Sequence, residues 1–261
     1  MLLAIDIGNT QTVVGIQADG AWRHVWRRET NARTTEDELA AWMHSLFQAS
    51  QLPFAVEAIV CASVVPSANA AVEHLARKWF GVAPLFLSNQ LPLGIEVRYD
   101  PPHAVGADRL ANALGALAKY APPIVVVDFG TATTFDSIGA DGAYVGGAIL
   151  PGVMISTQAL VERTAKLPQI EFKAPPFAVG RSTVESLQSG IVLGYAGAID
   201  ALARRIRAEL GETTTIISTG GLSGLFTGVC ETIQHHEPTL TLEGMAIAYD
   251  RVRPDRAVRL A

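Results

Sequence analysis

Hydrophobic and polar positions form their clearest pattern near the N-terminus. Residues 2–5 and 13–16 are apolar arms, and they flank a short polar turn that contains Gly8. This pattern predicts a hairpin of two buried strands. The turn holds more small polar side chains than a hairpin bend requires. No side chain bulkier than Gln lies between Gly8 and Val13, so the turn suits phosphate binding through backbone N–H and hydroxyl groups.

The same pattern recurs near the start of the second half. Residues 123–135 repeat the order apolar strand, Asp, apolar residue, Gly, small polar run, apolar strand. The matched positions are Asp6 with Asp128, Gly8 with Gly130, and Thr12 with Thr134. Two unrelated hairpins, each with an Asp at the end of its first strand, are the alternative interpretation. We favour a duplicated domain whose two turns face each other and hold one triphosphate.

Both halves continue with a common order of elements. Each hairpin is followed by a third strand, at 21–28 and around 143–149, and then by alternating helices and strands. A capping box that begins at Thr35 opens the first helix. Three strands followed by this alternation predict an α/β fold with a mixed sheet flanked by helices in each half. We place the two domains at 1–118 and 119–261.

Composition and charge exclude several classes of protein. Hydrophobic residues are 49% of the chain and charged residues 17%, as in an ordered globular protein. The net charge of −5 argues against nucleic-acid partners and anionic membranes, because such partners require a basic face. The arginine-containing end at 251–259 is interpreted as a solvated tail.

The cysteines and the absence of common nucleotide-binding motifs exclude further classes of protein. Cys61 and Cys230 lie in no metal-binding or redox spacing, and we interpret them as buried free thiols of a cytoplasmic protein. No apolar run approaches the roughly 18 residues of a membrane span, and no signal-like segment precedes Asp6. The histidines show no ligand spacing. Neither a P-loop nor a Gly-x-Gly-x-x-Gly segment is present, which disfavours a P-loop ATPase and a dinucleotide oxidoreductase.

A candidate catalytic group lies at the start of a helix predicted from Gly106 to about Tyr120. An Asp in a first helical turn, here Asp108, is ordinarily a cap for free N–H groups. Phosphoryl transfer to an alcohol, however, needs a base directed at the hydroxyl. Beside two phosphate-binding turns, Asp108 is therefore the candidate base. Arg109 is a candidate partner for an acidic substrate or for the transferred phosphoryl group.

Four segments of the chain, taken in order, closely resemble type III pantothenate kinases. They are Asp6 to Thr10, Gly106 to Arg109, Asp128 to Thr133, and Gly146 to Gly152. The resemblance spans nearly the whole chain. It implies the superfamily of acetate and sugar kinases, heat-shock ATPases and actin, in which two duplicated ribonuclease H-like domains bind ATP in a central cleft. The implied activity is ATP-dependent phosphorylation of pantothenate to 4′-phosphopantothenate, the first step toward coenzyme A.

The resemblance also implies roles for single residues. Asp108 would accept the proton, and Asp128 would bind a monovalent cation, K⁺ or NH₄⁺, beside the divalent ion, such as Mg²⁺, that accompanies ATP. Thr183 would reach pantothenate from the neighbouring subunit of a homodimer, although Thr183 or Ser182 could merely cap the helix that follows. The residues expected at ATP are Asp6, Ile7, Gly8, Asn9, Thr10, Gln11, Thr12, Val13 and Thr131. Those expected at pantothenate are Tyr99, Gly106, Ala107, Asp108, Arg109 and Thr183.

Other interpretations stay open for parts of this pattern. Bvg accessory factors, which act in gene regulation, share the fold and much of the motif set, and a sugar or acetate kinase of the superfamily is a third possibility. The joint presence of Asp6, Asp108, Arg109 and Asp128 favours the pantothenate kinase. Residues 146–152 could instead form a tight strand-to-helix connection with a proline at the first helical position.

Overall fold

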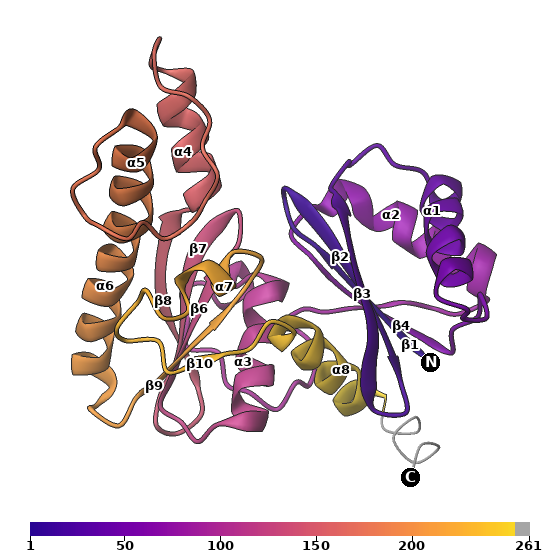
Figure 1. The fold of residues 1–261 in the computed structure, drawn as a ribbon. Helices are drawn as coiled ribbons and strands as arrows, with labels where there is room; N and C mark the ends of the chain where they lie inside the picture. Colours follow the sequence, from indigo (N-terminus) through magenta and orange to yellow (C-terminus); the bar gives the residue numbers. More distant parts are fainter. Residues whose placement is uncertain (254–261) are drawn as a thin grey trace. The chain divides into compact units, whose positions relative to one another are not determined.

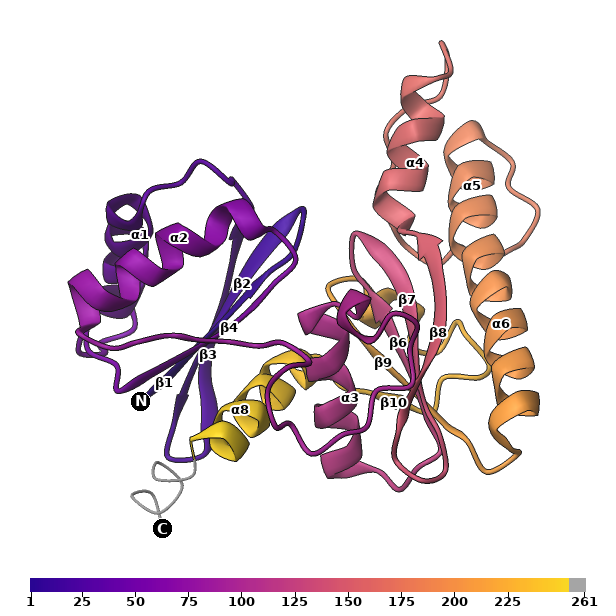
Figure 2. The ribbon, with the colours of Figure 1, turned by 180° about the vertical axis from the view of Figure 1, so that it is seen from behind.

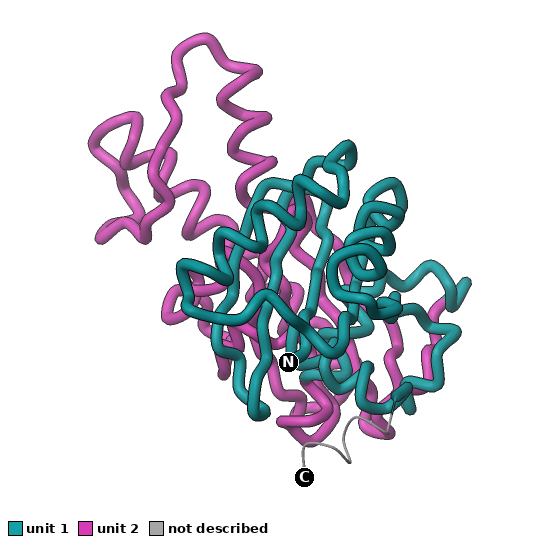
Figure 3. Tube along the Cα trace, turned by 90° about the vertical axis from the view of Figure 1, so that its right-hand side faces the viewer, with its two compact units in different colours: residues 1–94, 100–115, 241–261 teal, residues 95–99, 116–240 magenta. Residues whose placement is uncertain are grey.

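A computed structural model describes residues 1–253 of the 261-residue chain. The chain forms two compact units, drawn in two colours in Figure 3. Of the described residues, unit 1 holds 1–94, 100–115 and 241–253, and unit 2 holds 95–99 and 116–240. The units differ from the expected halves, 1–118 and 119–261, because residues 95–99 pack with unit 2 and the last helix packs with unit 1.

Unit 1 is built on a five-stranded mixed sheet (Figure 1). Its strands are β1 (Leu2–Ile7), β2 (Gln11–Ala18), β3 (Ala21–Glu29), β4 (Ala58–Ser63) and β5 (Leu85–Phe86). The spatial order is β3-β2-β1-β4-β5. The first three strands are antiparallel, and β4 pairs with β1 in parallel. The predicted third strand is thus an edge strand of the sheet, with Arg23, Arg27 and Glu29 exposed and Arg28 partly buried.

Helices cover both faces of this sheet. One face packs on α1 (Glu36–Ala49), α2 (Pro66–Leu75) and the wide turn η1 (Ala76–Phe80), around a core that includes Ile5, Met43 and Phe47. Thr35 caps α1 through the predicted capping box with Glu38. On β2, Gly15 lies so close to Leu242 of α8 (Leu240–Val252) that an added Cβ would be 2.8 Å from the leucine Cδ1. The last helix therefore packs directly against the sheet at Gly15.

Unit 2 repeats the same sheet topology. Its strands are β6 (Ile124–Phe129), β7 (Ala132–Ile138), β8 (Tyr144–Pro151), β9 (Thr215–Thr219) and β10 (His235–His236). The order β8-β7-β6-β9-β10 has the same antiparallel and parallel pairings as β3-β2-β1-β4-β5. This identity of topology confirms the predicted fold class of two α/β units, each with a mixed sheet flanked by helices, and supports the predicted duplication.

The helices of unit 2 lie beside its sheet and beyond one end of it (Figures 1 and 2). They are α4 (Val153–Glu162), α5 (Thr183–Gln188), η3 (Ser189–Leu193), α6 (Gly194–Leu210) and the short α7 (Ser223–Phe226). The core against the sheet includes Val127, Phe135 and Ile199. The short turn η2 (Pro102–Ala104) precedes α3 (Ala107–Lys119).

The C-terminal segment differs from the sequence prediction. The tail expected at 251–259 begins inside α8, and the Arg251 guanidinium donates a hydrogen bond to the carbonyl oxygen of Leu93. The part of that tail after Arg253 lies outside the described residues. Cys61 and Cys230 are buried free thiols, as predicted. Within the described part of the chain, every helix is too short or too polar to cross a membrane.

Candidate functional site

The first polar turn is a tight bend between β1 and β2. Asp6 is the last residue but one of β1 and lies on the face opposite the α1 and α2 core, since its neighbours Ile5 and Ile7 point into that core. The backbone N–H of Gly8 donates to the carbonyl oxygen of Gln11 across 3.0 Å. Asn9 and the Gln11 side chain are exposed. The bend thus presents small polar groups beside a carboxylate, which suits a phosphate with its cation.

The second bend has the same construction with one residue fewer. The N–H of Gly130 donates to the carbonyl oxygen of Ala132 across 3.1 Å, so the bend closes over three residues instead of four. Asp128 faces away from the core as Asp6 does, because Val127 and Phe129 are the core residues. By strand register Thr12 pairs with Ile7 and Thr133 with Phe129. The predicted match of Thr12 with Thr134 is therefore wrong by one residue, because an ungapped match assumes bends of equal length.

Gly152 packs against the backbone of the second bend. The N–H of Gly152 donates to the carbonyl oxygen of Thr131 across 3.0 Å, and a Cβ at this position would be 2.1 Å from that oxygen. The segment Gly146 to Gly152 thus has a steric reason for glycine at its last position. Pro151 is the final residue of β8 and Gly152 is the N-cap of α4, so the alternative with Pro151 at the first helical position is wrong.

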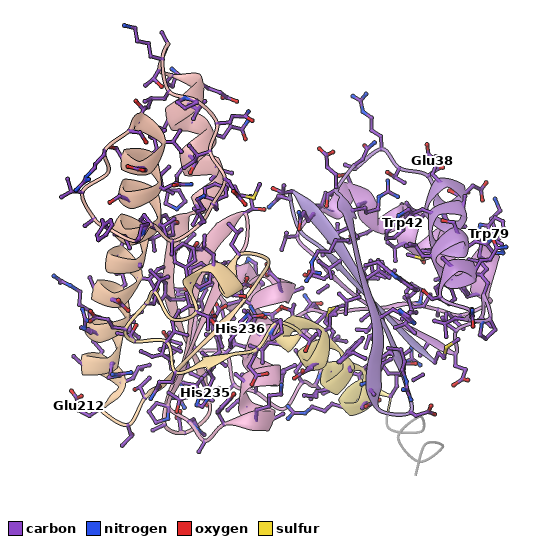
Figure 4. The ribbon with its side chains drawn as sticks, viewed as in Figure 1. Glu38, Trp42, Trp79, Glu212, His235 and His236 are labelled. Carbon is purple, nitrogen blue, oxygen red and sulfur yellow. The ribbon has the colours of Figure 1, made fainter. Side chains whose placement is uncertain are left out.

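The turn at Gly220, which follows β9, lies directly against the Asp128 carboxylate. Gly220 has φ +95°, and an added Cβ would be 2.4 Å from Asp128 Oδ1. The Ser223 hydroxyl donates to the Gly220 carbonyl oxygen across 2.6 Å, and His236 Nε2 is 2.8 Å from Ser223 Oγ. Because the single Ser223 proton goes to Gly220, the His236 ring donates to Ser223. His235 and His236 extend from β10 (Figure 4).

The proposed base lies at the N-terminus of α3. Asp108 Oδ1 accepts the backbone N–H of Arg109 across 2.8 Å, so the capping interaction considered above is present. Burial raises the pKa of the Asp108 carboxyl above its ordinary value, while the hydrogen bond and charge of Arg109 oppose the shift. An added Cβ at Gly106 would be 2.4 Å from Asp108 Oδ1, so any other residue here would have to displace the carboxylate from its present position.

Within unit 1, the helix start and the first bend converge. An added Cβ at Gly106 would be 3.5 Å from a methyl of Val64, and the N–H of Val64 donates to the carbonyl oxygen of Ile7 across 3.0 Å. One residue of β1 and one loop residue therefore link the start of α3 to the Asp6 end of the strand. The structure thus brings the start of α3, where Asp108 lies beside Gly106, near the end of β1 that leads into the Asp6 to Val13 bend.

Tyr99 packs on Tyr144, which is bonded to Asp136, and these two buried residues of unit 2 are together called the Tyr99 platform. Residues 95–99 run beside β8, with the N–H of Tyr144 donating to Glu96 O and the N–H of Arg98 donating to Tyr144 O, each across 2.8 Å. The Tyr99 and Tyr144 rings meet edge to face at 6.3 Å. The Tyr144 hydroxyl donates to Asp136, a fully buried carboxylate, across 3.1 Å. Tyr99 is therefore fixed in place, and it remains only partly buried.

Thr183 lies apart from these groups within unit 2. It is the first residue of α5 and is exposed, whereas Ser182 is the N-cap whose hydroxyl accepts the N–H of Glu185 across 3.2 Å. Capping is therefore assigned to Ser182, and the Thr183 side chain is left accessible.

Several residues of these sites were missed by sequence reasoning. Asp136 and Tyr144 behind Tyr99, Ser223 and His236 behind Gly220, and Thr30 behind the first bend carry no motif of their own. A signal near them came from Gly8 and Gly146, which lie in the first and fourth of the four segments, because glycine permits close approach of the backbone. The central cleft predicted between the two halves stays a prediction.

The residues that are present fit a nucleotide with its cations. Asp6 and Asp128 supply carboxylate oxygens, which hard cations prefer, and each carboxylate adjoins a bend of small residues. Mg²⁺ is usually bound by one or two carboxylates together with substrate phosphates. The donor chemistry of both bends is thus appropriate for a phosphate group and a metal ion.

Known proteins resemble this chain along nearly its full length. A family model described as type III pantothenate kinase matches residues 2–205. A type III pantothenate kinase from Desulfatibacillum aliphaticivorans is 45% identical over 254 residues, which cover 97% of this chain and 99% of that protein. One from Anaeromyxobacter sp. (strain Fw109-5) is 43% identical over 254 residues, with 97% of this chain and 100% of that protein covered.

Solved structures share the fold at low sequence identity. A Campylobacter jejuni protein assigned to the Baf family of transcriptional activators has a TM-score of 0.62 at 17% identity, covering 97% of this chain and 99% of that one. MreB 5 of Spiroplasma citri, bound to AMPPNP, has a TM-score of 0.53 at 10% identity, covering 99% and 98%. These likenesses concern the fold alone.

Proposed function

Because this chain belongs to the type III pantothenate kinase family, we propose that it transfers the γ-phosphoryl group of ATP to pantothenate. The products are ADP and 4′-phosphopantothenate, as in the first step toward coenzyme A. The observation that carries the proposal is the convergence, in unit 1, of the Asp108 helix start with the Asp6 to Val13 bend. A base and a phosphate-binding turn in one neighbourhood are what transfer to an alcohol requires.

Each group has a defined part in the proposed reaction. The pantothenate hydroxyl loses its proton to an Asp108 oxygen as its own oxygen bonds to the γ-phosphorus, and the bond from that phosphorus to the leaving ADP oxygen breaks. Arg109 offsets negative charge on pantothenate or on the transferred group. Tyr99, on its platform, contacts pantothenate together with Gly106 and Ala107. Asp6 to Val13 and Thr131 contact ATP.

Two kinds of cation accompany the reaction in this proposal. A divalent ion, such as Mg²⁺, neutralises phosphate charge as it does for kinases in general. Asp128 binds a monovalent cation, K⁺ or NH₄⁺. Support comes from the position of the Asp128 carboxylate, which is fixed against Gly220 at a bend expected to face phosphate. A carboxylate in that place repels a triphosphate unless a cation lies between them.

We further propose that the enzyme is a homodimer whose sites include Thr183 of the second subunit. Apart from Trp79, the large hydrophobic side chains that are exposed in the described chain all lie in unit 2 between Ile149 and Val184, with Phe177 74% and Val179 81% exposed. Along η3 and α6, an added Cβ at Gly190, Gly194 or Gly197 would meet nothing within 4 Å. The fold of this chain does not require these small residues, whereas close contact with a second copy would.

A mixing experiment tests the shared site. Asp108→Asn and Thr183→Trp subunits should each be inactive alone, because one lacks the base and the other blocks pantothenate. After random exchange, about half of the dimers are mixed and each has one intact site, so about a quarter of wild-type activity should return. Exchange is verified with two affinity tags. No recovery from exchanged dimers would remove Thr183 from the neighbouring site.

The activity itself is tested by coupled ADP release with pantothenate as the acceptor. Turnover is expected with Mg²⁺ and K⁺, and it should fall when Na⁺ replaces K⁺. Acetate and common sugars serve as control acceptors for the other kinases of the superfamily. Folded protein that turns over none of these acceptors would favour the gene-regulatory alternative. A cytoplasmic location is part of the proposal, because both cysteines are free thiols.

A further inference from the structure

We propose that Thr30 is a positioning residue that holds the Gly8 to Thr12 bend in its phosphate-binding conformation. Thr30 follows the last residue of β3 and has no part in any of the four motifs. The inference rests on the ATP-binding role proposed above for the bend. It concerns how the chain fixes that bend, and it adds a residue that directly follows a strand which the sequence pattern identifies only as an exposed edge.

Thr30 makes three hydrogen bonds to three residues of the bend. Its backbone N–H donates to the carbonyl oxygen of Thr10 across 2.8 Å. Its hydroxyl donates to the carbonyl oxygen of Gly8 across 2.7 Å. Since that hydroxyl has one proton, the Thr12 hydroxyl must be the donor in the 2.9 Å contact with Thr30 Oγ1. The front, middle and end of the bend are therefore tied to one side chain and its own backbone.

The equivalent position in unit 2 explains why a side chain is possible here. Gly152 follows β8 as Thr30 follows β3, and its N–H donates to Thr131 O as that of Thr30 donates to Thr10 O. At Gly152 a Cβ would clash with Thr131 O at 2.1 Å and with Gly130 O at 2.8 Å. The first bend is one residue longer, and this length leaves room for the threonine side chain. The Thr30 hydroxyl donates to the Gly8 carbonyl oxygen, and the glycine at the equivalent position of the tighter second bend has no side chain to form such a bond.

Loss of the hydroxyl leaves two polar groups without this partner. Leu39 and Met43, which line the same hollow as Thr12 and Thr30, offer no hydrogen bond in its place. The polar side chains that line this hollow already have partners, since Arg28 donates to Thr34 and Asn31 Oδ1 accepts the N–H of Arg33. An unsatisfied, partly buried carbonyl and hydroxyl weaken the bend by an amount comparable to a tenfold change in an equilibrium constant. Valine has the shape of threonine without the hydroxyl, so Thr30→Val isolates this effect from a change in volume.

The test measures nucleotide binding directly as well as turnover. The Kd for AMPPNP with Mg²⁺ is measured by calorimetry, and KM is measured separately for ATP and for pantothenate. Thr30→Val should raise the Kd for AMPPNP and the KM for ATP about tenfold and leave the KM for pantothenate within about twofold. Thr30→Ser keeps the hydroxyl and should bind like the wild type. Thr34→Val is the matched control, because Thr34 lines the same hollow and its hydroxyl accepts a hydrogen bond from Arg28, which lies outside the bend.

Each outcome is informative. Wild-type affinity in Thr30→Val, or an equal loss in Thr34→Val, overturns the positioning role. If Thr30→Val does not fold, as judged by its Tm, the comparison of Thr30→Ala with Thr30→Ser decides in the same way. A wild type that binds AMPPNP but does not phosphorylate pantothenate refutes the proposed acceptor and leaves the Thr30 comparison valid. A wild type that does not bind AMPPNP refutes the ATP-binding role of the bend and the Thr30 inference with it.

Discussion

Asp108→Asn is expected to lower kcat by about 100-fold or more, the usual scale for loss of a positioned base. The substitution preserves size, and an Asn Oδ1 can still accept the Arg109 N–H that Asp108 Oδ1 accepts at 2.8 Å. The cap is therefore retained while the proton acceptor is lost. Steady-state kinetics with both substrates saturating measure the effect. Near-normal kcat would reassign Asp108 as a cap.

The stability of the same variant separates a catalytic role from a structural one. Burial raises the pKa of Asp108 in the folded state, so folding is favoured at a pH below the unfolded pKa and this contribution is lost as pH rises through the folded pKa. At neutral pH the carboxylate then costs stability, and Asp108→Asn should have an equal or higher Tm. Asp19→Asn, at an exposed turn, is the control for loss of a carboxylate far from the motifs.

The pH dependence follows from the same shift. Since the base acts only when it is deprotonated, the acidic limb of the kcat/KM profile for pantothenate should lie above the ordinary pKa of an aspartate, about 3.9. A limb at the ordinary value would place the base in an environment less buried than the structure gives Asp108.

Local sequence patterns were sufficient to predict the strands and the two bends. The apolar arms around Gly8 and Gly130 are short runs with a polar turn, and periodicity identifies such runs without any knowledge of long-range contacts. The capping box at Thr35 is equally local. These elements carry the motifs, so most of the candidate site followed from the sequence.

The last helix could not be found in this way. Of α8, the buried residues Leu240, Leu242, Met245, Ala246 and Ala248 are spread around the helix and form no single stripe. This distribution arises because the helix contacts two partners, Gly15 on β2 through Leu242 and Ala111 on α3 through Gly244. A pattern set by contacts so distant in sequence has no local period.

Thr30 and the register of the repeat were missed for a related reason. A threonine at a strand end has no special composition, and its role depends on the hydrogen bonds that return to Gly8 and Thr10. The one-residue difference between the bends is likewise fixed by the pairing of Thr12 and Thr133 with their partner strands. Both features become visible only when the strands are placed side by side.

Gly220→Ala is expected to reduce kcat/KM for ATP by about 100-fold, because it displaces Asp128. The alanine Cβ would lie 2.4 Å from Asp128 Oδ1 and 2.6 Å from the backbone nitrogen of Phe129. The backbone at φ +95° is also unfavourable for any residue with a Cβ. Since the Ser223 hydroxyl anchors the Gly220 carbonyl at 2.6 Å, the turn cannot easily withdraw, and Asp128 must move. A displacement near 1 Å in a phosphoryl-transfer site is enough for a loss of this size.

Gly221→Ala provides the control one residue away. An added Cβ at Gly221 would meet nothing within 4 Å, so this variant should keep kcat/KM for ATP within about threefold of the wild type. Activation by K⁺ measured on both variants separates two causes: displacement of Asp128 should also shift the K⁺ concentration needed for half-maximal rate. If Gly220→Ala retains wild-type ATP kinetics and K⁺ dependence, Asp128 does not act from the position it has against this turn. If Gly221→Ala loses as much activity as Gly220→Ala, the turn matters through its flexibility, and the steric argument for Gly220 fails.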